Sequence, residues 1–403
     1  MASEHSRSRR TDVPTERPRR DEFPTERLRR DEFSWTDAGE SIYLNAASTG
    51  PLPERCVRAQ DAFTRKRAAP HRLSQEEQFG VLSDSRTRIA ALIGADVAEI
   101  ALTTNTSAGL NLAAWAFPLG PGDVVVIPDL EFPANVYPWM AAAAARGFAL
   151  ERVPARDGLL DEEALLAALD RPGVRVLAVS WVGFATGVVA DLDALAQACL
   201  ARGIRFVVDA IQGLGALTLD VSRTPIDLLA CGGQKWLLSP WGTGFTYVRH
   251  ALVRELAPQP VSWMGVQGSD DFSRLLAYDM TWRDDARRFE QITLPFQDFA
   301  GMAASLELIH ELGPAALAGH IAERTGELLA GAAALGVQLV TPHTRHAGIA
   351  SLRPADAAAA SARLNAARVT HSEREGTVRL APHCYTTSDE IRVALHALVG
   401  ASS

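Results

Sequence analysis

A lysine in a glycine-rich loop is the residue whose surroundings most clearly suggest chemistry. Residues 231–244 read CGGQKWLLSPWGTG, so Lys235 lies among apolar and turn-forming residues. Burial disfavours the charged form of an amine and lowers its pKa, and a neutral amine is the nucleophile that forms a Schiff base with an aldehyde. A solvated surface lysine would fit the same loop, so the interpretation depends on the segments that accompany it.

An acidic residue ends the strand-like segment that precedes this loop. Residues 204–209 read IRFVVD, and in an open parallel sheet the carboxyl ends of the strands line the ligand crevice, so Asp209 would face a bound ligand. A carboxylate there can pair with a protonated pyridine nitrogen, as in pyridoxal 5'-phosphate (PLP) enzymes. Gln212 is placed to reach the phenolic oxygen of that cofactor. Taken alone, Asp209 is equally explained as a turn or helix cap.

A third segment has the features of a phosphate site. Residues 103–109 read TTNTSAG, between a strand-like segment and an apolar helical one. The free N–H groups and the dipole at a helix N-terminus favour an anion, and the hydroxyl groups add donors. A Ser/Thr helix cap without a ligand has the same pattern, so this motif is weak alone.

The elements that must position these residues alternate between β-branched runs and segments of helical period. This alternation predicts an α/β fold with a mostly parallel sheet and crossover helices. Strands are expected at residues 100–103, 124–128, 174–180, 204–209, 227–231 and 244–248, and helices at 107–117, 135–146, 161–169 and 192–202. Further on, helices at 300–312 and 315–335 precede short strands at 338–341, 347–352 and 377–381. We expect a large domain over residues 37–294 and a smaller C-terminal α+β domain over 295–403.

The N-terminal segment and the overall composition restrict the possible partners. Residues 1–36 are rich in Arg, Glu and Pro with a near-repeated decamer, which predicts a mobile tail. The net charge of -8 disfavours a nucleic-acid partner, and no apolar run is long enough for a membrane helix or a signal peptide. The four cysteines lack metal-site spacing. These features predict a cytoplasmic protein with a small-molecule substrate and no metal.

Together and in this order, these segments resemble the class V aminotransferase family of fold-type I PLP-dependent enzymes, which includes cysteine desulfurases, isopenicillin N epimerase-like proteins and kynureninases. The similarity covers nearly everything after about residue 41. It begins with YLNAASTGPLP at residues 43–53 and extends to VRLAPHCY at residues 378–385. A strand-end Asp with Gln three residues on, followed by the Lys-Trp loop with Gly-x-Gly, makes the combination specific.

The resemblance implies a role for each matching residue. Lys235 would carry PLP as a Schiff base and Asp209 would pair with its pyridinium nitrogen. Arg379 would bind the substrate carboxylate through its planar guanidinium. The remaining cofactor contacts would be Asn105, Thr106, Ser107, Phe132, Gln212, Gln234 and Thr293, and the remaining substrate contacts Asn45 and Trp181. Thr293 would reach the phosphate of a neighbouring subunit, which implies a homodimer with its site at the interface.

The sequence departs from the desulfurase pattern at two places. Phe132 stands where desulfurases have a histidine over the cofactor, and residues 369–378 contain no cysteine to receive sulfur. Persulfide chemistry is therefore disfavoured, and transamination of an amino acid is the leading hypothesis. A C–S or β-lyase, an epimerase, and a non-catalytic PLP-binding protein remain alternatives. A nicotinamide enzyme is disfavoured because the glycines at residues 213–215 lack the third glycine of the dinucleotide fingerprint.

Overall fold

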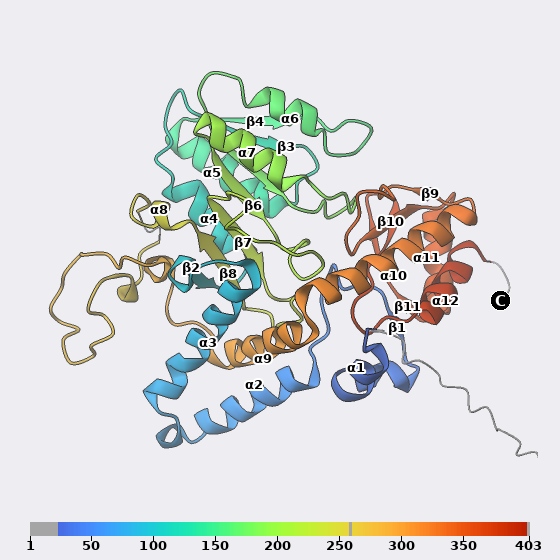
Figure 1. Cartoon of the computed structure of the whole chain (residues 1–403), viewed down its shortest axis with the longest axis horizontal. Coiled ribbons are helices and arrows are strands. Elements are labelled where there is room, and N and C mark those ends of the chain that lie inside the picture. Colours follow the sequence, from blue (N-terminus) through green and yellow to red (C-terminus); the bar gives the residue numbers. More distant parts are fainter. Residues whose placement is uncertain (1–22, 258–259, 401–403) are drawn as a thin grey trace, which may run out of the picture.

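A computed structural model describes residues 23–257 and 260–400, and in this part of the chain a seven-stranded sheet forms the centre of the large domain (Figure 1). In spatial order its strands are β2 (Ile100–Thr103), β8 (Gly244–Val248), β7 (Leu228–Gly232), β6 (Arg205–Asp209), β5 (Val174–Ser180), β3 (Val124–Pro128) and β4 (Ala149–Val153). Strand β8 runs antiparallel to both of its neighbours, β2 and β7, and the other six strands run in one direction. The predicted fold class, a mostly parallel sheet of fold-type I, is confirmed.

Helices cover both faces of this sheet because alternate strand residues point to opposite sides. On one face α4 (Thr106–Ala116) and α5 (Tyr137–Arg146) pack over Val125, Val176 and Val207. On the other face α6 (Glu162–Ala168) and α7 (Leu192–Arg202) pack over Val126 and Leu177. All of these strand residues are buried, so their continuous apolar runs are explained by burial on both faces.

Two long helices near the N-terminus were not predicted. Helices α2 (Glu54–Arg67) and α3 (Gln75–Ile93) lie beside α9 (Phe296–Leu312) along the large domain. Gln60 Nε2 donates to Asp298 Oδ1 at 2.7 Å, and Ser85 Oγ donates to the carbonyl of Phe299 at 3.0 Å. Helix α9 therefore packs on helices of the large domain, although it follows the expected boundary at residue 295, and that boundary stays a prediction.

The small domain combines one antiparallel sheet with three helices among the described residues. Its sheet has the order β12 (Ser372–Arg374), β13 (Thr377–Leu380), β10 (Ala350–Arg353), β9 (Gln338–Leu339). The helices are α10 (Pro314–Ala334), α11 (Ala357–Ala366) and α12 (Ser388–Val399). A short parallel pair, β1 (Ile42–Tyr43) with β11 (Val369–Thr370), brings the start of the family-like region to this domain.

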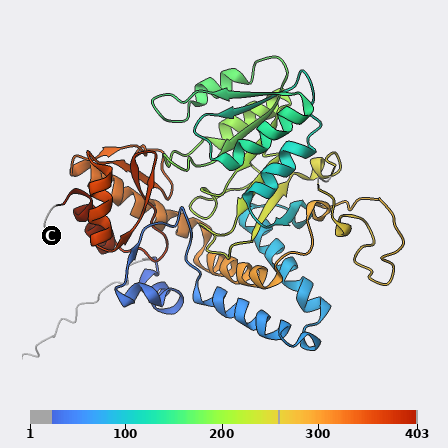
Figure 2. The same cartoon turned by 180° about the vertical axis from the view of Figure 1, so that it is seen from behind.

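The predicted tail is ordered in part, so this prediction is wrong for residues 23–36. Helix α1 (Thr25–Glu32) and the 3-10 turn η1 (Ser34–Ala38) lie beside the small domain in both views (Figures 1 and 2). Leu28 and Phe33 are buried, and Arg29 Nη1 donates to Glu390 Oε1 at 2.8 Å and to the carbonyl of Tyr385 at 2.9 Å. These tertiary contacts provide the burial that the segment lacks on its own. Residues 1–22 of the predicted tail lie outside the described residues.

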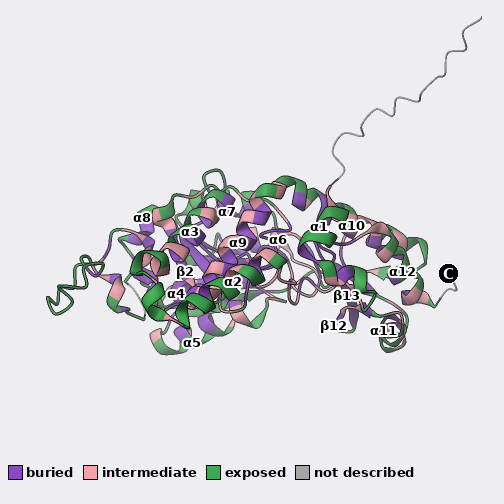
Figure 3. Cartoon of the chain, turned by 90° about the horizontal axis from the view of Figure 1, so that it is seen from below, coloured by how far each residue is buried: buried purple, intermediate pink, exposed green. Residues whose placement is uncertain are grey.

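An irregular segment projects from the large domain after α8 (His250–Val253), and its outer part is exposed (Figure 3). Exposed side chains on it include Trp263, Leu276, Tyr278 and Met280. The remaining 3-10 turns are η2 (Pro70–Arg72), η3 (Val97–Glu99), η4 (Pro133–Asn135), η5 (Trp263–Gly265) and η6 (Ala286–Phe289). No helix in the described part of the chain is long and apolar enough to cross a membrane.

Candidate active site

A cavity of about 290 Å³ lies where the carboxyl ends of β2, β6 and β7 meet the small domain. Parallel strands direct their carboxyl ends to one edge of the sheet, which brings together loops that are far apart in the sequence. All but three of the residues predicted for the site line this cavity: Lys235, Asp209, Gln212, Asn105, Thr106, Ser107, Phe132, Gln234 and Arg379. The three exceptions are Asn45, Trp181 and Thr293.

Lys235 and Asp209 provide opposite charges in a poorly solvated space. Burial lowers the pKa of the Lys235 ammonium to about 8, although the charge of Asp209 opposes this shift. Burial likewise raises the pKa of Asp209 to about 6, while its Oδ1 accepts a hydrogen bond from the backbone N–H of Ile211 at 3.0 Å. At neutral pH the carboxylate is therefore ionised, and the amine is more easily deprotonated than an ordinary lysine.

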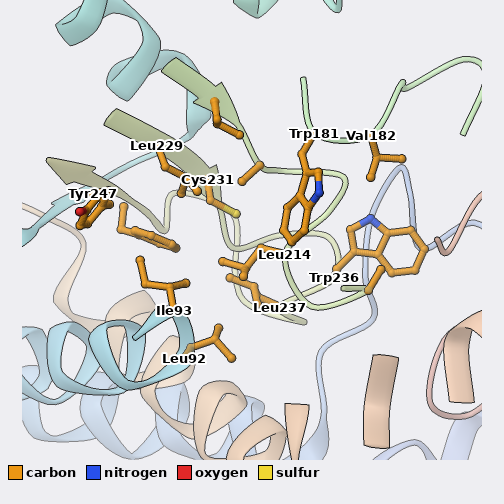
Figure 4. Close-up of a cluster of buried hydrophobic side chains, with 14 of the residues drawn as sticks. Leu92, Ile93, Trp181, Val182, Leu214, Leu229, Cys231, Trp236, Leu237 and Tyr247 are labelled. Carbon is orange, nitrogen blue, oxygen red and sulfur yellow. The ribbon is translucent and has the colours of Figure 1, made fainter. Parts of the chain in front are cut away.

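Trp236 holds the lysine loop in place. Its indole Nε1 donates to Gln212 Oε1 at 3.0 Å, and Gln212 Nε2 donates to the carbonyl of Ala47 at 2.9 Å. The ring lies directly on Gly348 of the small domain, where an added Cβ would come within 2.2 Å of it. Figure 4 shows Trp236 in the buried cluster of the large domain. The backbone position of Lys235 is thus fixed by packing against both domains.

The start of α4 forms a cradle of neutral donors. Asn105 caps the helix by accepting from the N–H of Ala108 at 3.0 Å, and Thr106 Oγ1 accepts from the N–H of Gly232 at 2.9 Å. Ser107 is exposed at the first turn. A Cβ at Gly232 would lie 2.4 Å from Gln234 Oε1, so a larger residue there would displace the end of the Gln234 side chain. Hydroxyl groups and a helix N-terminus are a donor set that suits a phosphate.

Phe132 faces the lysine from a loop that a buried carboxylate anchors. Lys235 Nζ lies 5.8 Å from the centroid of the Phe132 ring, which also packs edge-on against Phe184, with 5.2 Å between the ring centroids.

Glu131 anchors the Phe132 loop by accepting three hydrogen bonds. Two come from Ser180, from its backbone N–H at 2.7 Å and from its hydroxyl at 2.5 Å, and the third comes from Asn135 Nδ2 at 3.0 Å. Burial raises the pKa of Glu131 to about 7. No pattern in the sequence predicted that Glu131 anchors this loop.

Arg379 is buried in the small-domain wall of the cavity. Its Nη1 donates to the carbonyl of Phe184 at 2.7 Å and its Nη2 to Ser48 Oγ at 2.8 Å. Its Nε is buried and has no partner among the described residues. Asn45, predicted to contact substrate, accepts from Ser372 Oγ at 2.6 Å and does not line the cavity, which Ala47 and Ser48 of the same segment do. Its contact with substrate stays a prediction.

Two other predicted residues lie outside this cavity. Trp181 is buried in the core and its ring covers Gly213, where an added Cβ would lie 2.3 Å away (Figure 4). Trp181 does not line the cavity, and its predicted contact with substrate stays a prediction. Thr293 is exposed and does not line the cavity of its own chain. Its expected contact with a neighbouring subunit stays a prediction.

Comparison with known proteins identifies the class of protein that this fold and site define. The chain belongs to the aminotransferase class V family, whose model matches residues 42–392. PLP is the cofactor of this family. The donors at α4, the buried carboxylate of Asp209 and the amine of Lys235 fit its phosphate, its pyridine nitrogen and its aldehyde, respectively.

The relatives of this chain carry the names of different activities. An uncharacterised aminotransferase of Bacillus subtilis is 30% identical over 77% of this chain and 81% of its own length. An isopenicillin N epimerase of Streptomyces clavuligerus is 34% identical over 55% of this chain and 57% of its own. Among solved structures, a cystine C–S lyase in complex with cysteine persulfide is 25% identical with a TM-score of 0.81, covering 89% of this chain and 97% of that chain.

Proposed function

We propose that this protein is a PLP-dependent aminotransferase acting on an amino acid, with Lys235 as its catalytic residue. The observation that carries the proposal is the position of Lys235 Nζ in one cavity with the buried carboxylate of Asp209 and the buried guanidinium of Arg379. A lysine attachment point, an acid for the pyridine nitrogen and a carboxylate receptor are the three groups that such a reaction requires.

Each residue has a defined task in this proposal. Bound PLP withdraws electrons from the substrate Cα and makes its proton acidic. Lys235 Nζ takes that proton, and its lowered pKa allows it to act as a base near neutral pH. Arg379 orients the substrate carboxylate so that the Cα–H bond faces the lysine. Asp209, ionised at neutral pH, keeps the pyridine nitrogen protonated.

The cysteines argue against a desulfurase. Cys56, Cys199, Cys231 and Cys384 are all buried, and burial raises the pKa of each thiol. A thiol that accepts sulfur must be exposed and easily ionised. Transfer of sulfur to a cysteine of this chain is therefore disfavoured.

Elimination at the β-carbon is the second candidate, and the likeness to a cystine C–S lyase favours it. A lysine base and a carboxylate receptor serve this reaction as well. A two-base epimerisation is less well supported, because Phe132 faces Lys235 and has no proton to exchange. Transamination and elimination differ in their products, so product analysis separates them.

Borohydride trapping tests the attachment site. The chain has only two lysines, Lys66 and Lys235, so a reduced cofactor adduct can be assigned by peptide mass. We expect the adduct on Lys235 and none on Lys66, which lies on the surface and is paired with Glu77. An adduct absent from Lys235 would refute the assignment.

A panel of amino acids then tests the reaction. We expect a 2-oxo acid to appear as the cofactor becomes pyridoxamine phosphate, and Lys235→Ala protein to lose this activity. A cleaved side chain with release of ammonia, and no pyridoxamine phosphate, would instead establish the lyase. Full activity of the Lys235→Ala variant would refute both mechanisms.

We also propose a homodimer in which Thr293 reaches the cofactor phosphate of the second subunit. Trp241, close to the lysine loop, is 73% exposed in the single chain, and the projecting segment carries Leu276 at 81% and Tyr278 at 88% exposure. Apolar surface of this extent is usual where another chain docks. Sedimentation equilibrium should give twice the chain mass; a monomer that still binds PLP tightly would contradict the proposal.

A further inference from the structure

A second arginine, to which the sequence analysis assigned no role, shares the cavity with Arg379. Arg374 lies at the end of β12 and lines the same cavity. Its partner strand β13 carries Arg379, and the register pairs Ser372 with Arg379 and Arg374 with Thr377. Side chains alternate along a strand, so Ser372, Arg374, Thr377 and Arg379 share one face of this hairpin.

The spacing of the two arginines suits a ligand with two anionic groups. Arg374 and Arg379 are diagonal neighbours across an antiparallel pair, which places their Cα atoms roughly 7–8 Å apart. Both lie on the small-domain wall, whereas the neutral phosphate cradle is at the start of α4 in the large domain. Arg374 is therefore on the substrate side of the cavity.

Neither arginine has an acidic partner within the described residues. Arg374 Nη1 donates only to the carbonyl of Glu373, at 2.7 Å, and the side chains of Glu373 and Glu375 are exposed. Arg379 has contacts with a carbonyl and hydroxyl groups, and its Nε has none. Asp209 is the one carboxylate among the described cavity residues. Burial lowers the pKa of Arg379 to about 10, and the charge of Arg374 contributes to the same shift because two cations facing one cavity without counter-ions repel each other.

With the phosphate held by the neutral donors at α4, assignment of the other charges leaves Arg374 without a partner. On the proposed function, on which this inference rests, Asp209 pairs with the pyridine nitrogen and Arg379 binds the α-carboxylate. We propose that Arg374 binds a second anionic group, so that the substrate is an amino acid whose side chain ends in a carboxylate or a sulfinate. A charge-assisted hydrogen bond of this kind in a poorly solvated cavity strongly favours an acidic side chain over its amide.

Binding of simple acids to the holoenzyme tests this inference without turnover. Titration calorimetry with succinate and with propionate compares two carboxylates with one. We expect succinate to bind about 10-fold or more tightly, and Arg374→Gln to remove this preference while leaving propionate binding unchanged. Arg374→Lys should retain part of the preference because it keeps the charge. Arg392→Gln, an exposed arginine paired with Asp389 on α12, is the matched control and should change neither.

The same variants separate this inference from the proposed function. With wild-type enzyme, aspartate, glutamate and cysteine sulfinate should react with the cofactor at higher kcat/KM than asparagine, glutamine and alanine, and the most reactive acid identifies the side-chain group. Reaction of neutral amino acids with no preference for acidic ones, or equal weakening of succinate and propionate by Arg374→Gln, would overturn the inference while leaving the proposed function intact. The second result would mean that Arg374 shares the α-carboxylate.

Discussion

Replacement of Lys235 by methionine should stabilise the cofactor-free protein at neutral pH. The folded state lowers the pKa of Lys235 from 10.5 to about 8, and the attraction of Asp209 is already included in that value. Each pH unit between the two values corresponds to about 1.4 kcal/mol. The buried ammonium therefore costs about 3 kcal/mol below pH 8, and the Lys235→Met variant avoids this cost.

The pH dependence gives the sharper test. Between pH 8 and 10.5 the unfolded wild-type chain binds more protons than the folded one, so its stability rises with pH and approaches that of the variant. Urea unfolding of both cofactor-free proteins from pH 7 to pH 10 measures this convergence. The Lys66→Met control removes a lysine that is 49% exposed and should show no such dependence. A constant difference between wild-type and Lys235→Met proteins over this range would refute the reasoning.

Three further changes test how the site is supported. Arg86→Met leaves the buried carboxylate of Glu290 without its ion pair at 2.7 Å and should lower the free energy of unfolding by about 3–5 kcal/mol in urea titrations. Gly348→Ala places a methyl group within 2.2 Å of the Trp236 ring; it should cost about 1–3 kcal/mol and weaken PLP retention measured by dialysis. Arg29→Ala removes the hydrogen bonds that join α1 to the small domain. It should lower the free energy of unfolding by about 2 kcal/mol and speed proteolysis near residues 23–36, because α1 detaches more easily.

Matched substitutions control for each of these changes. Arg88→Met breaks a half-exposed ion pair with Glu307. Gly319→Ala adds a methyl group to helix α10 with no atom within 4 Å, and Arg30→Ala removes an exposed side chain of α1. We expect small effects from all three. If any control were as damaging as its partner, the corresponding contact would not be the cause.

The local sequence pattern was sufficient to predict many of the strands of the large domain. The strands at residues 100–103, 124–128, 174–180 and 244–248 were predicted to the residue, because their apolar β-branched runs are buried on both faces of the sheet. Helices α2 and α3 were not predicted: α2 carries charged residues along most of its length and only Cys56 and Phe63 are buried on it. Its packing partner α9 lies more than two hundred residues away.

The sequence by itself predicted the residues that we propose for the chemistry, because Asp209 ends a strand, Lys235 and the start of α4 each follow one, and the carboxyl ends of parallel strands meet at one edge. Tertiary structure alone decided which other side chains line the cavity. The pairing of β12 with β13 brings Arg374 beside Arg379, and the ring of Trp181 packs on Gly213 and does not line the cavity. The physical reason is that a strand end can be recognised from local pattern, whereas the direction of a side chain depends on pairing and packing with segments distant in the chain.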